Sequence, residues 1–168
     1  MGAWRAFALQ NGGFSITNPG RTAAMIHLPP QEPPLSDTAH KLFHEDIRAT
    51  CGPVAEAAVT LVEALAEGEP EDLPPHIHCR LAGALLEGQR GGATNALANW
   101  TAGYATATGW EVYSEASSPR SLARWRHVGM LPAGQPIRLP DSRIELTPII
   151  THGHATSRAR REAHTATN

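Results

Sequence analysis

Short apolar runs and segments of helical periodicity follow one another along the chain. Residues 4–9 and 23–28 are apolar runs, separated by turn-forming sequences that contain Asn11-Gly12-Gly13 and Asn18-Pro19-Gly20. Runs of this length bounded by such turns are typical of strands. The pattern therefore predicts a short N-terminal β-hairpin within residues 1–30.

Four later segments repeat apolar residues every three or four positions, which is the spacing of one helix face. They cover residues 36–50, 53 to about 66, 76–87 and 94–107. The second is the clearest, because Val54, Ala58, Leu61, Val62 and Leu65 form one stripe opposite a face that carries glutamates. The short connections between these segments favour antiparallel neighbours, so we expect a four-helix core within residues 35–108.

The pattern changes again after residue 116. Pro119 suits a first helical turn, Ser117 or Ser118 can cap it, and Gly129 ends a short basic helix at residues 118–129. Residues 135–139 and 143–148 alternate as two strands around a turn at 140–142. The C-terminal part is therefore predicted to be a basic helix followed by a β-hairpin.

This helix and hairpin resemble the recognition helix and wing of excisionase-type and mercury-resistance-regulator (MerR) type DNA-binding domains. The resemblance rests on Ser118, Arg120, Ser121, Leu122, Trp125, Gly129 and Leu131 within residues 117–148. It implies a winged helix-turn-helix element, although residues 109–113 read as a strand where that family has a first helix.

The expected fold class is therefore α+β: a short N-terminal β-hairpin, an acidic four-helix core, and a winged-helix-like C-terminal part. The predicted divisions are 1–30 for the hairpin segment, 35–108 for the helical domain, 109–150 for the winged segment and 151–168 for a disordered basic tail.

Composition and charge narrow the expected setting. Hydrophobic residues make up 41% of the 168 residues, which favours a folded chain. No apolar run is long enough to span a membrane and no signal peptide is evident, so a cytoplasmic location is expected. Cys51 and Cys79 are then simply buried small residues. Thirteen of the 16 acidic residues lie between residues 31 and 116, whereas eight of the 14 basic residues follow.

A basic half of this kind can bind a polyanion while the acidic half is held away from it. Together with the resemblance, this favours a DNA-binding regulatory or accessory protein of a mobile element such as a plasmid or phage. The expected partner is double-stranded DNA, with a possible homodimer through the helical region. The candidate DNA-binding residues are Arg120, Arg124, Arg126, His127, Arg138 and Arg143.

Two alternatives stay open at this stage. The first is a metal-binding enzyme or module that uses His76, His78 and Cys79, because imidazole and thiolate groups are zinc ligands. His40 and His44 are four positions apart, and His152 and His154 are two apart; both spacings can supply a pair of ligands, but no set has the full context of a known site. The second alternative is a non-catalytic protein-interaction module. The sequence thus leaves enzymatic activity undecided, with the balance against it, and predicts no cofactor and no catalytic residue.

Residues 88–92, Gly-Gln-Arg-Gly-Gly, are rich in glycine, as phosphate-binding loops are. The segment lacks the Lys-Ser/Thr ending of a P-loop, and no strand is predicted before it. It is therefore interpreted as a flexible turn between two helices.

Overall fold

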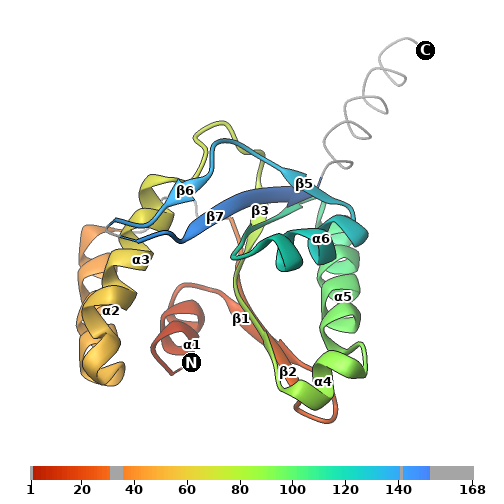
Figure 1. The fold of residues 1–168 in the computed structure, drawn as a ribbon, viewed down its shortest axis with the longest axis horizontal. Coiled ribbons are helices and arrows are strands. Elements are labelled where there is room, and N and C mark those ends of the chain that lie inside the picture. The colour runs from red at the N-terminus through yellow and green to blue at the C-terminus, as the bar shows by residue number, and fades with distance from the viewer. Residues whose placement is uncertain (1, 31–35, 141, 152–168) are drawn as a thin grey trace.

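The computed structural model describes residues 2–30, 36–140 and 142–151. A mixed, seven-stranded β-sheet runs through it, with strand order β1-β2-β3-β4-β7-β5 and with β6 paired to β7. The helices cover both faces of this sheet (Figure 1): α1, α2 and α3 lie on one side, and α4, α5 and α6 on the other. The core is therefore built between sheet and helices.

The elements of the first half are a helix, a hairpin and a helical pair. They are α1 (Gly2–Gln10), β1 (Phe14–Thr17), β2 (Ala23–Leu28), α2 (Asp37–Thr50), the short 3-10 helix η1 (Gly52–Val54) and α3 (Ala55–Glu67). Ser36 caps α2 by accepting a hydrogen bond from the backbone N–H of Ala39. Phe7, Phe43 and Val59 are buried together, so α1, α2 and α3 share one core beneath the sheet.

The second half supplies the rest of the sheet and its other cover. Its elements are β3 (His76–Ala84), α4 (Leu86–Arg90), α5 (Ala93–Thr108), β4 (Glu111–Ala116), α6 (Pro119–His127), β5 (Met130–Pro132), β6 (Ile137–Arg138) and β7 (Glu145–Thr151). Ile77, Leu97 and Ile149 belong to a second core, between the sheet and α5.

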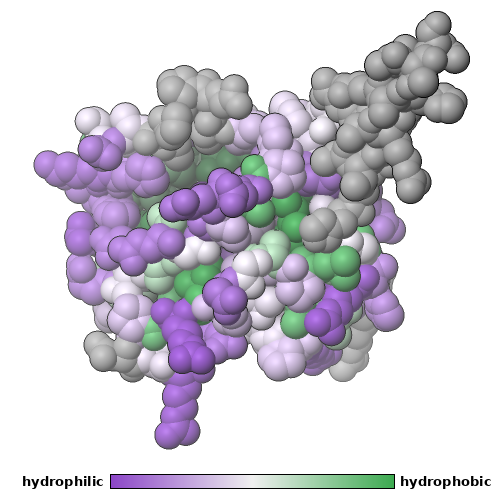
Figure 2. Space-filling view, turned by 90° about the horizontal axis from the view of Figure 1, so that it is seen from above, coloured by the Kyte–Doolittle hydropathy of each residue, from purple (hydrophilic) through white to green (hydrophobic). Residues whose placement is uncertain are grey.

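Hydrophobic and hydrophilic residues alternate over the face of the molecule in Figure 2. Seen from above, hydrophobic patches lie between hydrophilic side chains (Figure 2). The apolar surface on this side is thus divided by polar groups.

The predicted fold class is wrong, and β3 shows why. Residues 76–87 were expected to form a helix because Ile77, Leu81 and Leu85 are spaced by four. In the structure, residues 76–84 form a strand with a different period: His76, His78 and Arg80 alternate with buried Ile77 and Cys79. Without that helix there is no four-helix core, and α5 packs on the sheet instead.

The N-terminal hairpin also forms from other residues than predicted. Residues 4–9 lie within α1, and β2 pairs with β1, with Phe14 opposite His27 and Thr17 opposite Ala24. An apolar run of six residues does not distinguish a helix from a strand. Here it packs as a helix against Phe43.

The winged-helix-like arrangement is wrong as well. The helix α6 forms, with Ser118 and Ser121 in a capping box, and β6 pairs with β7 as a hairpin. However, β7 continues into the main sheet, where it pairs with β4 and β5, and Ile149 is fully buried. The segment before α6 is the strand β4, so no first helix of a helix-turn-helix is present in the described chain. The predicted tail lies outside the described residues, apart from Thr151.

Candidate functional site

The site begins where β3 and β4 separate. These two parallel strands pair only from His76 opposite Glu111 to His78 opposite Tyr113. Beyond that point β3 pairs with β2 alone, and β4 pairs with β7. The sheet therefore has an opening between two neighbouring strands, with an edge of β3 that no strand covers.

A β-bulge sits at the start of this opening. Ile26 of β2 lies opposite Leu81 and His27 lies opposite Cys79, so Arg80 is the extra residue of β3. A bulge bends its strand and redirects the side chain that it carries. On the other side of the opening, Ser114 of β4 donates a hydrogen bond from Oγ to the Cys79 carbonyl, at 2.9 Å.

One cavity lies beside the opening on the α5 side, and we call it the α5 cavity. It has a volume of about 310 Å³. Its lining comes from the end of β3, from α4, from the start of α5 and from α6: Ala82, Gly83, Ala84, Gln89, Thr94, Asn95, Ala98, Ser121, Arg124, Trp125 and Val128. Ala82 is exposed although it lies within a strand, so small side chains leave this part of the sheet open.

The N-terminus of α5 gives this cavity its electrostatic character. Gly92 is the N-cap residue and adopts the left-handed conformation, with φ 71°, and no side chain caps the helix. The first backbone N–H groups of a helix have no partner within it, and they carry the positive end of the helix dipole. Phosphates commonly bind at such a terminus. Arg124 of α6 adds a full positive charge to the same cavity.

The sequence predicts a flexible turn for the loop that leads to this helix, residues 88–92, and predicts no strand before it. In the structure the strand β3 comes before it, and the short helix α4 lies between β3 and α5. Gln89 of α4 lines the cavity. The missed signal was the alternation of residues 76–81, which makes the preceding segment a strand and the glycines a strand-to-helix loop.

A second cavity lies on the other side of the opening, and we call it the α3 cavity. It has a volume of about 210 Å³. Trp4, Leu61, Leu65, Leu81 and Leu146 give it apolar walls. Its basic and acidic side chains are those of Arg80 and Glu115, which come from the two separating strands, and Cys79 also contributes to the lining.

The two cavities meet at the opening. Ala82, Ser121 and Trp125 line both of them. The partly buried Trp125 packs against the core between the sheet and α5. The two cavities therefore adjoin at these three residues, next to the separated strands.

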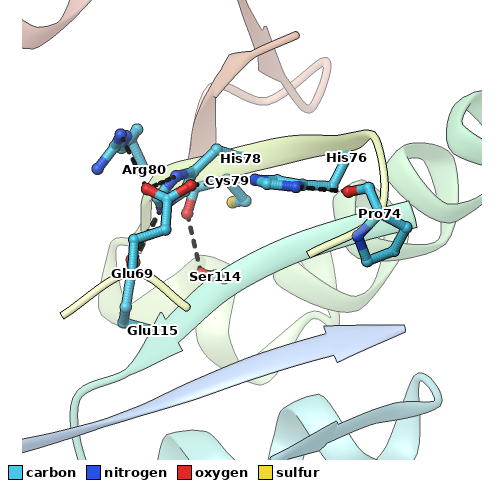
Figure 3. Close-up of polar contacts among 8 residues, drawn as sticks. All are labelled: Glu69, Pro74, His76, His78, Cys79, Arg80, Ser114 and Glu115. Atoms are coloured by element: carbon cyan, nitrogen blue, oxygen red, sulfur yellow. Dashed lines mark hydrogen bonds and ion pairs between the residues drawn. The ribbon is translucent and has the colours of Figure 1, made fainter. Parts of the chain in front are cut away.

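Behind the α3 cavity lies a buried pair, His78 and Glu115. The His78 Nε2 atom is 2.9 Å from one Glu115 carboxylate oxygen and 3.1 Å from the other. Both side chains are only 5% exposed. The pair links β3 to β4 just where the strands begin to separate (Figure 3). It places a carboxylate and an imidazole in direct contact at the edge of the cavity.

Glu69, from the loop between α3 and β3, completes this polar cluster (Figure 3). Its carboxylate is 3.4 Å from His76 Nε2, 3.6 Å from His78 Nδ1 and 3.6 Å from the Arg80 guanidinium. His76 also contacts the Pro74 carbonyl through Nδ1, at 2.8 Å. One carboxylate is thus shared by three basic groups.

The surroundings of this cluster change the pKa values of two side chains, Glu69 and Tyr113. Burial opposes ionisation of Glu69, but hydrogen bonds from His76 and His78 outweigh it, so the pKa of this carboxyl lies well below its usual value. Burial and the nearby Glu115 charge raise the pKa of Tyr113, whose ring packs edge-on against His78. Tyr113 therefore stays protonated while Glu69 stays charged.

The predicted metal set of His76, His78 and Cys79 does not assemble. Successive residues of a strand point to opposite faces, so Cys79 joins the core on the α5 side, and burial raises the pKa of its thiol to about 12. Glu69, His76 and His78 do bring three ligand-type atoms within 4.8 Å of one another. Of the other histidine pairs, His44 lies 3.8 Å from Glu63, and His152/His154 lie outside the described residues.

The predicted DNA-binding residues are all exposed. Arg120, Arg124, Arg126 and His127 lie along α6, and Arg138 pairs with Glu145 across the β6–β7 hairpin at 3.2 Å. Arg143 lies in the connection between these two strands. Of the six, only Arg124 lines the α5 cavity.

The fold is that of the GNAT-family acetyltransferases. The Drosophila melanogaster polyamine N-acetyltransferase, described as forming N-acetylagmatine, is similar over 88% of this chain and 79% of that one, with a TM-score of 0.56 and 18% identity. An apo agmatine N-acetyltransferase S171A mutant is similar over 88% and 81%, with a TM-score of 0.54 and 15% identity. No protein-family model matches the chain, and no curated protein sequence is significantly similar to it.

These similarities overturn the function predicted from the sequence. A DNA-binding regulator of a mobile element is wrong, as are its helix-turn-helix class, its role in transcription and its DNA partner. The alternatives of a metal-binding enzyme and of an interaction module are not supported either. The resemblance arose because α6 has a capped, arginine-rich outer face, while Leu122 and Trp125 on its inner face pack against the sheet.

None of the described helices has both the length and the apolar character that a membrane span requires.

Glu69, Arg80 and Glu115 were not selected from the sequence. Glu115 had been counted only as part of the acidic half.

Proposed function

We propose that this protein is an N-acetyltransferase that uses acetyl-coenzyme A as the acetyl donor and an amine as the acceptor. The observation that carries the proposal is the opening between β3 and β4, with one cavity on each side and three residues common to both. A transfer reaction needs two ligands whose reacting atoms meet, and this arrangement supplies two adjoining sites. The GNAT-family fold supports the same function.

The α5 cavity has the groups that coenzyme A requires. The uncapped N-terminus of α5 and the guanidinium of Arg124 fit its phosphates. Ala82, Gly83 and Ala84 give room beside the uncovered edge of β3, where the backbone can pair with the amides of the pantetheine chain. When bound, acetyl-coenzyme A supplies an acetyl thioester, whose carbon–sulfur bond breaks as the carbon–nitrogen bond of the product forms.

The α3 cavity has the groups that an amine acceptor requires. A primary amine is protonated near neutral pH, since an alkylammonium has a pKa of about 10, and only the neutral form is a nucleophile. The carboxylate of Glu115 can take that proton, and His78 can hold or relay it through Nε2. Glu69 then stabilises a positive charge on His78 from its Nδ1 side.

The remaining proton balance is simple. The nitrogen gives its second proton to the departing sulfur, so the products are an N-acetyl amide and a thiol, and the first proton is released to solvent. Ser121 lines both cavities. Its hydroxyl caps α6, where it accepts from the Ser118 N–H at 3.0 Å and donates to the Ser118 carbonyl at 2.9 Å.

The two neighbours named above are described as acting on polyamine or agmatine, which supports an amine as the acceptor class here. The cytoplasmic location predicted from the sequence stays a prediction, since nothing in the fold bears on it.

The test is an acetylation assay on the purified chain. Thiol release from acetyl-coenzyme A is measured with a panel of primary amines, and the N-acetyl product is identified by mass spectrometry. Titration calorimetry with coenzyme A gives the dissociation constant of the α5 cavity separately. Absence of both coenzyme A binding and amine-dependent thiol release would reject the proposal.

A further inference from the structure

Arg80 is a cation on the wall of the α3 cavity that its own protein satisfies poorly. Its side chain is only 15% exposed, and the carboxylate nearest to it is that of Glu69, at 3.6 Å. A charge-assisted N–H···O bond is usually 2.7–2.9 Å long. Among the described residues, no hydrogen-bond partner reaches the Arg80 Nε atom.

Glu69 does not compensate for this, because the same carboxylate also serves His76 and His78. A guanidinium has five N–H donors in a planar fork that matches a carboxylate with two parallel bonds. Buried polar groups are normally hydrogen-bonded, so a partly buried guanidinium with one long contact has donors available for a ligand.

The rest of the cavity limits which ligand that is. Glu115 provides a negative charge, Arg80 a positive one, and Trp4, Leu61, Leu65 and Leu146 provide apolar walls. The Arg80 guanidinium carbon lies 5.9 Å from the centroid of the Trp4 ring, close enough for a cation–π contact. At about 210 Å³ the cavity is smaller than the roughly 300–1,000 Å³ typical of sites for drug-sized ligands. The ligand is therefore small, carries both charges, and has an apolar body.

The geometry points to an apolar α-amino acid as the acetyl acceptor, with Arg80 as the residue that binds its carboxylate. This inference rests on the proposed acetyltransferase function and adds the acceptor class. The amino group lies toward Glu115, where it loses its proton, and the hydrocarbon or aromatic side chain packs on the leucines and Trp4. A second positive charge on the acceptor would be repelled by Arg80, so diamines are poor acceptors.

The first test changes only the acceptor. Values of kcat/KM are compared for leucine, methionine and phenylalanine and for the amines that lack their carboxylate, isoamylamine, 3-(methylthio)propylamine and phenethylamine, with 1,5-diaminopentane as the doubly charged control. We expect at least one amino acid to exceed its own decarboxylated amine by about 10- to 100-fold, the value of a hydrogen bond to a charged group. Equal or better use of all three decarboxylated amines, or of the diamine, would overturn the inference.

The second test changes the protein. Arg80→Gln should reduce kcat/KM for the preferred amino acid by about 10- to 100-fold and leave its decarboxylated amine within about twofold. Arg80→Lys should retain part of the preference, because a charge is kept without the fork. Arg48→Gln, at an exposed arginine paired with Glu56, is the control. An equal loss on both acceptors would mean that Arg80 has only a structural role.

The inference can also be tested if acetyl transfer is absent. Titration calorimetry of the preferred amino acid, or of each of the three if no turnover is seen, reports binding to the α3 cavity directly, in the wild type and in Arg80→Gln. Binding that is lost in Arg80→Gln supports the acceptor assignment even where the proposed reaction fails. No binding by any of the three amino acids, together with no turnover, overturns it.

Discussion

The α5 cavity and the α3 cavity lie on either side of the same opening in the sheet, but they are built from different parts of the chain. The α5 cavity is lined mainly by uncharged residues at the end of β3 and in the first turns of α5, such as Ala82, Gly83 and Ala98, and Arg124 adds a basic side chain. The α3 cavity uses ionisable side chains, Arg80 and Glu115, supported from behind by His78.

Because of this difference, we expect the two cavities to tolerate different substitutions. Backbone N–H groups are present in any sequence that keeps the fold, so the phosphate binding that we propose at the N-terminus of α5 would depend on conformation more than on residue identity. The proton transfer that we propose in the α3 cavity would depend on one carboxylate and one imidazole. Variants can therefore be chosen to affect one cavity and leave the other unchanged.

The largest expected effect is that of Glu115→Gln. The amide keeps the size of the side chain and an oxygen that can accept from His78, but it cannot take a proton from the acceptor. We expect kcat to fall by about 10²–10⁴-fold, the usual contribution of general base catalysis, with the affinity for coenzyme A unchanged. Steady-state rates and calorimetry measure the two quantities.

Glu63→Gln is the matched control, because Glu63 is an exposed glutamate on α3, 54% exposed and outside both cavities. It should retain full activity. If Glu115→Gln kept more than about a tenth of the wild-type kcat, Glu115 would not be the base.

The next effect concerns the backbone of the α5 cavity. Gly92→Ala places a Cβ on a residue with φ 71°, which costs about 1–2 kcal/mol, and the added atom meets nothing within 4 Å. The strain and the methyl group fall at the helix N-terminus that we propose binds phosphate. Gly109→Ala imposes the same backbone cost at the other end of the same helix, where φ is 74°. Both variants should lose similar stability in urea unfolding.

Only Gly92→Ala should weaken coenzyme A, by about tenfold, as expected for the loss of about 1.4 kcal/mol of binding. Equal dissociation constants for the two variants would show that the N-terminus of α5 does not bind the cofactor. Calorimetry at one ionic strength is sufficient for this comparison.

The elements that could be predicted from the sequence are those that depend on residues close to one another in the chain. The helix α6 was predicted because its signals are local: Ser118 as a cap, Pro119 in the first turn, and Gly129 after the end. The strand β4 was likewise expected from residues 109–113. These elements depend on neighbours in the chain, and they formed within a few residues of the predicted positions.

The site could not be predicted in this way because its parts come together only in the sheet. Glu115 and His78 are 37 residues apart, and their contact depends on the parallel pairing of β3 and β4. The helical spacing of Ile77 and Leu81 concealed that pairing, although the alternation of His76, His78 and Arg80 was visible in the sequence. Once β3 is read as a strand, the glycine-containing loop after it becomes a candidate phosphate site.

A smaller effect is expected for Arg124→Ala. Arg124 is an exposed side chain, so its contribution to phosphate binding is screened, and we expect coenzyme A to bind about three- to fivefold more weakly at low salt. Arg126→Ala, two residues along the same helix and outside the cavity, should bind as the wild type does. The difference between the two variants should shrink at high salt. A difference that persists at 1 M salt would contradict an electrostatic role.

The smallest effect on acetyl transfer at neutral pH is expected at His27, which lies beneath α5 and outside both cavities. Its Nε2 is 3.0 Å from the Thr101 hydroxyl oxygen, and the ring is fully buried. Burial, with a smaller contribution from the charge of His78, lowers the pKa of His27 from 6.5 to about 4. Replacement by Gln removes this titration and can keep a hydrogen bond to Thr101.

The effect of His27 should be seen in stability instead. Between pH 6.5 and about 4 the unfolded chain binds a proton at His27 that the folded chain does not, so the stability from neutral His27 is complete above pH 6.5 and falls as the pH is lowered. The slope is at most about 1.4 kcal/mol per pH unit. Glu69, with its lowered pKa, begins to lose its contribution only below its ordinary value of 4.5. Urea unfolding at pH 7, 5.5 and 4.5 should therefore show a smaller loss of stability for His27→Gln than for the wild type. Parallel profiles would mean that the pKa of His27 is the same in the folded and the unfolded chain, which would contradict the burial effect described for this residue.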